Sequence, residues 1–533
     1  MLYHIVIGLL AVVFSLTAAA SRPQFYTAAV YDHAITFNTY KATNRSAALA
    51  IMSKNLDILE VQMTEAKLQG ADIFVFPEYG LYGSLDGRAS ASMFSEFIPE
   101  PSIVTPYCPS LNSSIPAGPE VLYRLSSLAR ANQMYLAVNM ADQQPCLGKH
   151  FYCPSNGHYQ YNTEVVFNRK GCLIAKYHKR NLFEVEKLMW DVPEVEYSYF
   201  DTEFGRFGLM VCFDAVFKEP AITLVEDYGV TDVIFSTAWM NVYPHYLSVA
   251  YHSGWARNLG VNFLASNIHY PKGRLVGSGI YGPEGVIEFV FNTTKQFGTL
   301  LVAEVPVVQK LEAFAEHSES RVSVQLPFQN KTFSLEIFGD LFTFTALTGL
   351  SGNVALSHGE VHCNLDFTRT STADEYALGA FDGMHTLEGE YYFEICLLVR
   401  CTDNYTDCNT LVTNETVTEF TFFSLFGSMQ TQYVFPEVVT PDTNFTTDWI
   451  FTKEGRENKI TGKNKMISSA VLMGRNFDKD PFRRQLTINE IALTIFDDEP
   501  GTTPAAGAQH RIDICLLFYG VILLLAIQKR IIY

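Results

Sequence analysis

The stretch from Gly205 to Phe217, "GRFGLMVCFDAVF", places one cysteine between two patterns of secondary structure. Residues 207–211 are apolar apart from one glycine, and they predict a short buried strand. The segment that follows, "KEPAITLVEDYG", predicts a helix with Pro220 in its first turn. Cys212 therefore lies at a strand-to-helix turn, where its thiol can leave the core and face a substrate. A buried structural cysteine is the alternative, because free cysteine behaves as a small hydrophobic side chain.

Strand and helix patterns alternate on both sides of this stretch. Strands are predicted over 25–31, 71–80, 134–140, 232–237 and 261–267, and a hairpin over 161–178. Helices are predicted over 46–70, 119–133, 218–229 and 245–260. Strands that interleave with helices imply sheets whose faces are covered by helices.

The character of the chain changes after about residue 310, where aromatic, β-rich segments are separated by Gly, Asp, Thr and glycosylation triplets. These segments cover 333–347, 391–399, 419–426, 433–439 and 486–496. We therefore predict a second, mostly β domain over 309–500 that follows a first domain over 21–308.

The composition is that of a globular chain. Of the 533 residues, 48% are apolar and 18% are charged, and the length is sufficient for two or more domains. The formal net charge of −18 argues against a nucleic-acid partner, because phosphate binding requires clustered Lys and Arg.

Both ends of the chain are apolar. Residues 5–20 end in three alanines and predict a signal peptide (1–20) that is cleaved before Ser21. Near the C-terminus, small residues from Gly501, a polar spacer and an apolar run over 514–527 predict a GPI-attachment signal within 501–533. That run has 14 residues, whereas a spanning helix needs about 20. A short transmembrane helix is the alternative.

Seven glycosylation triplets agree with a route through the secretory pathway to the outer face of the cell membrane, or with secretion. Their asparagines are Asn44, Asn112, Asn292, Asn330, Asn404, Asn414 and Asn444. Of the ten cysteines, Cys515 lies in the tail, and a free Cys212 would leave eight for four disulfides. Cys146–Cys153 and Cys401–Cys408 are plausible short pairings.

Two further residues share the strand-end position of Cys212. Glu78 follows the apolar run "IFVFP", where partial desolvation would raise the pKa of its carboxyl and suit a general base. Lys179 follows "CLIAKYH", where an ammonium group can hold an oxyanion. A loop acid that faces water is the alternative for Glu78, and the abrupt end of the strand argues against it. A solvated turn lysine is the alternative for Lys179 and is the usual explanation for a lysine taken alone.

Together these motifs resemble the Glu–Lys–Cys triad of the nitrilase superfamily. The segments "YHKRNLFEVE", "FGRFGLMVCFDAVF", "TAWMNVYP", "HSGWARNLGVNFLASN" and "GSGIYGPEG" are similar to its vanin and biotinidase branch, and the similarity covers nearly the whole chain. The apolar tail resembles that of vanins, whereas biotinidase is typically a soluble secreted protein. The resemblance implies a nitrilase-like α-β-β-α sandwich followed by a β-rich domain.

The resemblance also implies the hydrolysis of a linear amide without a metal or a cofactor. Carried over residue by residue, Cys212 is the nucleophile, Glu78 the base and Lys179 the cation beside the oxyanion. The backbone N–H of Phe213 would share that oxyanion.

A second acid near the lysine is common in the superfamily. Glu184 and Glu186 are the candidates here, and we rank Glu186 first. His252, Trp255 and Arg257, on one predicted helix, are further candidates for the pocket wall, although packing suits Trp255 better.

The function implied by the resemblance is an amidase that splits pantetheine into pantothenate and cysteamine. A biotinidase-like enzyme acting on biocytin is the alternative within the class. A catalytically silent surface protein is the alternative outside it, and the intact triad argues against that reading. The implied partners are a small amide substrate and a membrane reached through a lipid anchor, and no protein partner is indicated.

Overall fold

The computed structural model describes residues 23–35, 42–83, 85–101, 108, 120–146, 153–154, 156–309, 331–411, 416–445 and 448–481. Every element named below belongs to one compact unit that extends to Asp480. The predicted signal peptide, the anchor signal and the predicted strand over 486–496 lie outside the described residues. So do the triplets at Asn112, Asn330 and Asn414.

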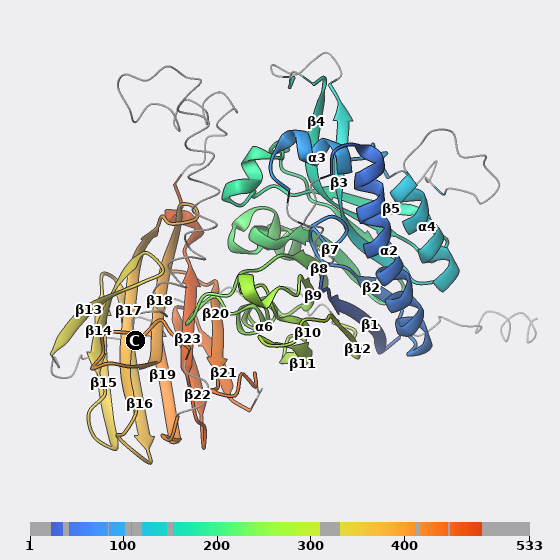
Figure 1. Cartoon of the computed structure of the whole chain (residues 1–533). Coiled ribbons are helices and arrows are strands. Elements are labelled where there is room, and N and C mark those ends of the chain that lie inside the picture. Colours follow the sequence, from blue (N-terminus) through green and yellow to red (C-terminus); the bar gives the residue numbers. More distant parts are fainter. Residues whose placement is uncertain are drawn as a thin grey trace, which may run out of the picture. The chain divides into compact units, whose positions relative to one another are not determined.

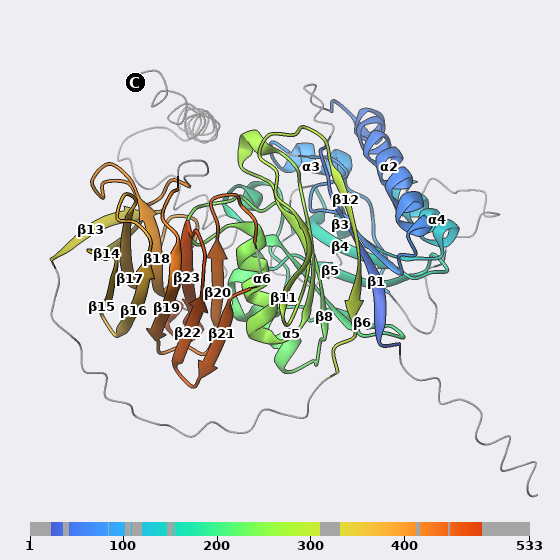
Figure 2. The same cartoon turned by 90° about the horizontal axis from the view of Figure 1, so that it is seen from below.

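Two six-stranded sheets form the first part of the fold (Figures 1 and 2). In order across the first sheet, the strands are β12 (Thr299–Pro306), β1 (Phe25–Asp32), β2 (Ile73–Val75), β3 (Tyr135–Pro145), β4 (His158–Phe167) and β5 (Leu173–His178). The second sheet contains β11 (Gly285–Val290), β10 (Ser278–Gly282), β9 (Asn262–Asn267), β8 (Asp232–Thr237), β7 (Arg206–Val211) and β6 (Tyr199–Asp201). Three neighbouring strands of each sheet are parallel, so their carboxyl ends lie at one edge.

Helices cover the outer faces of these sheets. The α-helices are α2 (Arg45–Leu68), α3 (Arg88–Phe94), α4 (Glu120–Asn132), α5 (Thr223–Glu226) and α6 (Ser248–Leu259). Apolar side chains of α2 and α4 pack on the first sheet, and those of α6 pack on the second. The inner faces of both sheets meet in a separate apolar cluster that includes Val75 and Ile234. The α-β-β-α sandwich is therefore confirmed.

The predicted elements of this sandwich are present, but one strand and one helix are shorter than predicted. The strand predicted over 71–80 is only β2 (Ile73–Val75), and the chain turns over 78–80. Over 218–229, the structure has a π-helical segment, η3 (Lys218–Ile222), followed by the single turn of α5. The predicted hairpin is formed by β4 and β5, and Asn168 accepts hydrogen bonds from the backbone within its turn.

Two antiparallel sheets form the second part of the fold. In order across the six-stranded sheet, the strands are β13 (Thr332–Ile337), β14 (Asp340–Ala346), β17 (Glu375–His385), β18 (Tyr391–Cys401), β23 (Ser469–Arg475) and β20 (Val434–Val439). The five-stranded sheet contains β15 (Ser351–His358), β16 (Val361–Arg369), β19 (Phe420–Ser428), β22 (Glu457–Gly462) and β21 (Ile450–Glu454). An apolar cluster lies between the two sheets, so the β-rich domain is also confirmed.

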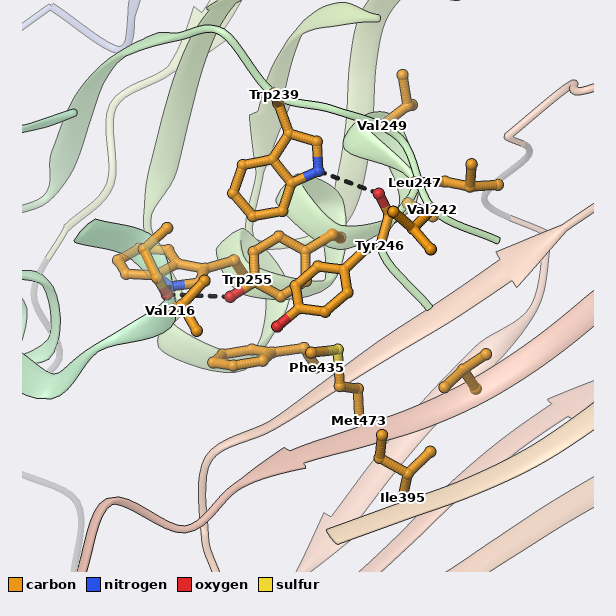
Figure 3. Close-up of a cluster of buried hydrophobic side chains, with 14 of the residues drawn as sticks. Val216, Trp239, Val242, Tyr246, Leu247, Val249, Trp255, Ile395, Phe435 and Met473 are labelled. Atoms are coloured by element: carbon orange, nitrogen blue, oxygen red, sulfur yellow. Dashed lines mark hydrogen bonds between the residues drawn. The ribbon is translucent and has the colours of Figure 1, made fainter. Parts of the chain in front are cut away.

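The second part packs directly on α6 and on the turn that carries Cys212. Figure 3 shows aromatic and aliphatic side chains of both parts in one cluster, with Trp255 and Phe435 among them. A Cβ atom on Gly254 of α6 would lie 2.6 Å from the carbonyl oxygen of Pro436, so only glycine permits this close approach. The fully buried Arg475 donates from Nε to the carbonyl oxygen of Val216 over 2.8 Å.

Four disulfides occur in the described residues. They join Cys108 to Cys172, Cys146 to Cys153, Cys363 to Cys396 and Cys401 to Cys408. Both predicted short pairings are confirmed, and Cys212 is free. This number of disulfides is typical of a protein that folds in the secretory pathway. No helix in the described part of the chain combines the length and the apolar character needed to cross a bilayer.

Candidate active site

Glu78, Lys179 and Cys212 each follow the end of a strand, and the two sheets bring those ends together. Lys179 and Cys212 come directly after β5 and β7, and Glu78 comes shortly after β2. The Lys179 Nζ donates to Glu78 Oε1 over 2.7 Å, and both side chains are 1% exposed. The charges of both groups act on the Cys212 thiol. Glu78 and Lys179 are therefore in direct contact, and Cys212 lies near enough to both for their charges to change the pKa of its thiol.

The second acid of the site is Glu186. It lies in a short 3-10 helix, η1 (Glu184–Leu188), and its Oε2 accepts from Lys179 Nζ over 2.6 Å. The hydroxyl of Tyr79 donates to its Oε1 over 2.5 Å. Glu184, two residues earlier, is exposed and faces Lys187 instead. The structure thus separates two acids that the sequence had left as alternatives.

Asn162, on β4, connects the two carboxylates and was not expected from the sequence. Its Nδ2 donates to Glu78 Oε1 and to Glu186 Oε1, each over 2.8 Å. The second oxygen of Glu78 accepts from the backbone N–H of Ala238 over 3.0 Å. Lys179 therefore lies between two carboxylates whose orientation is fixed by other donors. An asparagine within a strand pattern carries no sequence signal for such a role.

The turn at Cys212 has an unusual backbone conformation. Its φ angle is +47°, which is rare for a residue other than glycine, and such strain is concentrated at functional sites. Asp214 stabilises the turn, because its Oδ2 accepts from the backbone N–H of Val211 and from the Tyr177 hydroxyl. Its Oδ1 accepts from the backbone N–H of Asn181. The segment that follows Lys179 is thereby linked to the cysteine turn.

Burial governs the protonation of these groups. It raises the pKa of the Cys212 thiol above the ordinary value, the Glu78 charge raises it further, and the Lys179 charge opposes both. Burial also raises the pKa of Glu78 to about 7, against the lowering effect of Lys179 and with an added increase from Glu186. Burial works against ionisation of Glu186, but the Lys179 ammonium holds its pKa below the ordinary value. Burial thus keeps the thiol protonated at neutral pH.

The raised pKa of Glu78 predicts an acid limb in the pH profile of hydrolysis. Only ionised Glu78 can accept the thiol proton, so kcat/KM should fall by about tenfold per pH unit below this pKa. Glu186→Gln removes a negative charge that raises the pKa of Glu78, and the limb should move to lower pH. Glu184→Gln, which changes an exposed acid on the same short helix, is the control and should leave the limb in place. A limb that stays fixed in Glu186→Gln would contradict this coupling.

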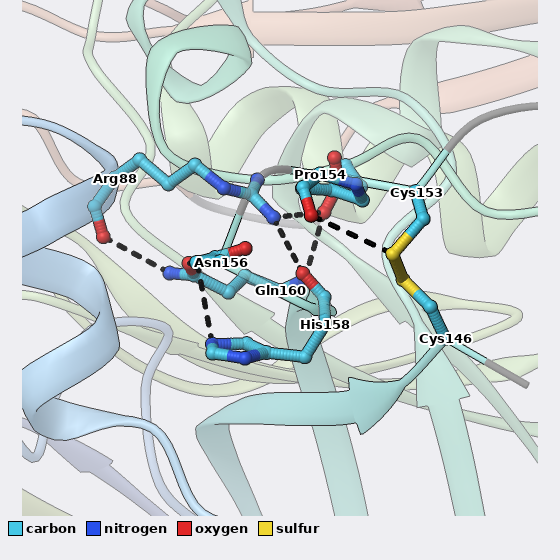
Figure 4. Close-up of a disulfide and its surroundings, with 8 residues drawn as sticks. Arg88, Cys146, Cys153, Pro154, Asn156, His158 and Gln160 are labelled. Carbon is cyan, nitrogen blue, oxygen red and sulfur yellow. Dashed lines mark hydrogen bonds and ion pairs between the residues drawn. A yellow bond between two sulfur atoms is a disulfide. The ribbon is translucent and has the colours of Figure 1, made fainter.

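The hairpin of β3 and β4 is joined to the segment after η1. Figure 4 shows the Cys146–Cys153 disulfide together with Arg88 and Gln160. The backbone N–H of Asp191 donates to the carbonyl oxygen of Gln160, and the backbone N–H of Gln160 donates to Oδ2 of Asp191, each over 2.7 Å. Arg88 forms an ion pair of 2.8 Å with the same carboxylate. These contacts stabilise the segment that holds Glu186.

Of the helical residues proposed for the pocket wall, His252 and Trp255 lie in the core and Arg257 is half-buried. His252 is fully buried and packs against the rings of Phe235 and Trp239, and Trp255 packs beside them. The guanidinium of Arg257 stacks on Trp449 of the second part. These three residues of α6 therefore serve in packing. The expectation that His252 and Arg257 line the wall of the pocket is corrected.

Comparison with known proteins agrees with this geometry. The carbon-nitrogen hydrolase family matches residues 28–287, and the vanin C-terminal domain family matches residues 331–480. The pantetheinase of Homo sapiens is 40% identical over 469 residues, which cover 86% of this chain and 91% of that protein. The biotinidase of Bos taurus is 34% identical over 498 residues, covering 85% of this chain and 93% of that protein.

Among solved structures, an amidase from Nesterenkonia sp. matches with a TM-score of 0.38 and 19% identity, over 54% of this chain and 94% of that chain. The two family matches and the similarity to pantetheinases over most of both chains show that this protein belongs to the vanin family of the nitrilase superfamily.

Proposed function

We propose that this protein hydrolyses pantetheine to pantothenate and cysteamine, with Cys212 as the nucleophile. The observation that carries the proposal is the buried Glu78–Lys179 ion pair beside a free cysteine at a strained turn. The pantetheinases of several mammals are 39% to 40% identical to this chain, and this similarity supports pantetheine over biocytin as the substrate.

In the proposed acylation step, Glu78 accepts the proton of the Cys212 thiol as the sulfur attacks the amide carbonyl. A carbon–sulfur bond forms, and the oxyanion is stabilised by the Lys179 ammonium and the backbone N–H of Phe213. The tetrahedral intermediate then expels the amine, which takes the proton from Glu78. The products of this step are cysteamine and a thioester of pantothenate.

The proposed deacylation step uses the same groups. Glu78, ionised again, accepts a proton from water as the water oxygen attacks the thioester carbonyl. The carbon–sulfur bond breaks, the thiol regains its proton from Glu78, and pantothenate leaves. Neither step needs a metal or a redox cofactor.

The test compares two substrates on the full-length protein purified in detergent from a eukaryotic secretory host. Release of cysteamine from pantetheine should exceed release of lysine from biocytin, and both should be absent from Cys212→Ala. Faster release of lysine would assign the protein a biotinidase-like activity instead. Absence of both activities, together with an unreactive Cys212, would favour the catalytically silent surface protein.

We further propose that the protein is glycosylated and is held at the outer cell surface by a GPI anchor attached near Gly501. Asn44, Asn404 and Asn444 are exposed and Asn292 is half-buried. Asn44 caps α2 through Oδ1, which leaves its Nδ2 available for a glycan. A phosphatidylinositol-specific phospholipase should release the protein from intact cells. If it stays on the membrane and keeps a tag placed after Tyr533, the short transmembrane helix is correct.

A further inference from the structure

A third carboxyl group lies beneath the candidate site and has no part in the chemistry proposed above. Glu164 is fully buried on β4, two residues after Asn162, so the two side chains point to the same face of the sheet. Asn162 bridges the two carboxylates of the site. Glu164 therefore occupies the layer directly next to the catalytic groups.

The two hydrogen bonds of Ser236 indicate whether the Glu164 carboxyl group carries a proton. The Ser236 Oγ is 2.8 Å from the carbonyl oxygen of Phe76 and 2.9 Å from Oε1 of Glu164. A serine hydroxyl has one proton, and a carbonyl oxygen can only accept. If that proton pointed to Glu164, two oxygen lone pairs would face each other at 2.8 Å. The Ser236 proton therefore belongs to the Phe76 carbonyl, and the other hydrogen bond needs a proton from Glu164.

We propose that Glu164 is a neutral carboxylic acid and a positioning residue, which donates to Ser236 so that Ser236 donates to the carbonyl of Phe76. Its Oε2 has no hydrogen-bond partner among the described residues, which suits a neutral acid better than a carboxylate. Burial, with a smaller contribution from Glu78, raises the pKa of Glu164 well above its ordinary range, although hydrogen bonding with Ser236 and Asn139 lowers it.

This chain of hydrogen bonds supports Glu78 from both sheets. Phe76 lies two residues before Glu78 at the end of β2 in the first sheet. Ser236, on β8 in the second sheet, lies two residues before Ala238, whose backbone N–H donates to Glu78 Oε2. The relay from Glu164 through Ser236 to Phe76 thus joins the two strand ends that orient Glu78. Its positioning role rests on the proposed function, in which Glu78 is the base.

The protonation state can be measured without a substrate. A protonated carboxyl group gives an infrared carbonyl band that is distinct from the bands of a carboxylate, and acids that are unchanged by a substitution cancel in a difference spectrum. The difference spectrum between the parent and Glu164→Gln should show the loss of one protonated-carboxyl band. Loss of a carboxylate band instead would overturn the proposal, whether or not pantetheine proves to be the substrate.

The positioning role is tested by the matched pair Glu164→Gln and Glu164→Leu. The glutamine amide can donate the same hydrogen bond, so kcat/KM should stay within about threefold of the parent, with the same acid limb. Leucine cannot donate, and kcat should fall by about 10- to 100-fold with little change in KM, because the base is misplaced.

Ser236→Ala interrupts the same relay from its centre and should match the loss in Glu164→Leu. The double variant should lose no more than either single variant, because both changes break one unit. Parent-like kcat in Ser236→Ala, or a loss in Glu164→Gln as deep as that in Glu164→Leu, would refute a positioning role for a neutral acid. If no substrate is turned over, the rate of alkylation of Cys212 by iodoacetamide, measured as a function of pH, can be compared among the same variants.

Discussion

Replacement of Cys212 by serine is expected to lower the rate of amide hydrolysis by roughly 10⁴-fold or more, as found when the nucleophile of a catalytic unit is removed. The hydroxyl of serine has a far higher pKa than a thiol, and Glu78, whose pKa is about 7, cannot deprotonate it effectively. Binding of substrate should persist, because the side chains have nearly the same shape. Steady-state hydrolysis and calorimetric binding measure the two effects separately.

The reactivity of the thiol provides an independent measurement for this prediction. Iodoacetamide should label Cys212 in the parent, because the other eight cysteines of the described residues form disulfides. Labelling of the same tryptic peptide should be absent from Cys212→Ser. Hydrolysis by Cys212→Ser at the parent rate would mean that Cys212 is a buried structural cysteine and that the nucleophile lies elsewhere.

The part of the site that could be predicted from the sequence consists of residues at strand ends. An apolar run that stops at a charged or nucleophilic residue indicates both a strand boundary and a side chain at the edge of a sheet. Glu78, Lys179 and Cys212 all have this pattern, and the sandwich places them together. The sequence ranked Glu186 above Glu184 but could not show which of them faces Lys179, because two acids in one short turn differ only in the direction of their side chains.

The residues that were missed lie inside strands or in the second part of the fold. Asn162 and Glu164 lie in the polar run of β4 that precedes its apolar end, and their roles depend on partners from distant segments. The sequence analysis also missed the strands β6, β10, β11 and β12 of the sandwich and β15, β16, β17, β21, β22 and β23 of the second part. The contact of Arg475 with Val216 joins residues 259 positions apart, which no local pattern can indicate.

Replacement of Lys179 by methionine is expected to impair both the chemistry and the fold. The sequence alone suggests only the loss of one oxyanion donor, which typically lowers kcat by about 10²- to 10³-fold. In the structure, the Lys179 ammonium is 2.7 Å from Glu78 and 2.6 Å from Glu186. Without it, two buried carboxylates face each other, and one of them must take up a proton. A protonated Glu78 cannot act as a base, so the loss should exceed that of a single donor.

The same change should lower the free energy of unfolding by about 3–5 kcal/mol, the usual effect of removing one partner from a buried ion pair. Lys187→Met, which removes an exposed lysine from η1, is the matched control and should change stability little. Urea-induced unfolding followed by intrinsic fluorescence measures this difference. A Lys179→Met protein as stable as the control would contradict the ion-pair arrangement described here.

The double variant Lys179→Met/Glu186→Gln separates the two roles of the lysine. Removing one carboxylate relieves the repulsion, so most of the lost stability should return. The rate should not return, because neither methionine nor glutamine supplies a cation where the oxyanion forms. If the rate recovers together with the stability, Lys179 serves only to neutralise the two acids, and the oxyanion must depend on backbone donors such as the N–H of Phe213. If only the stability recovers, the ammonium group acts in the transition state itself.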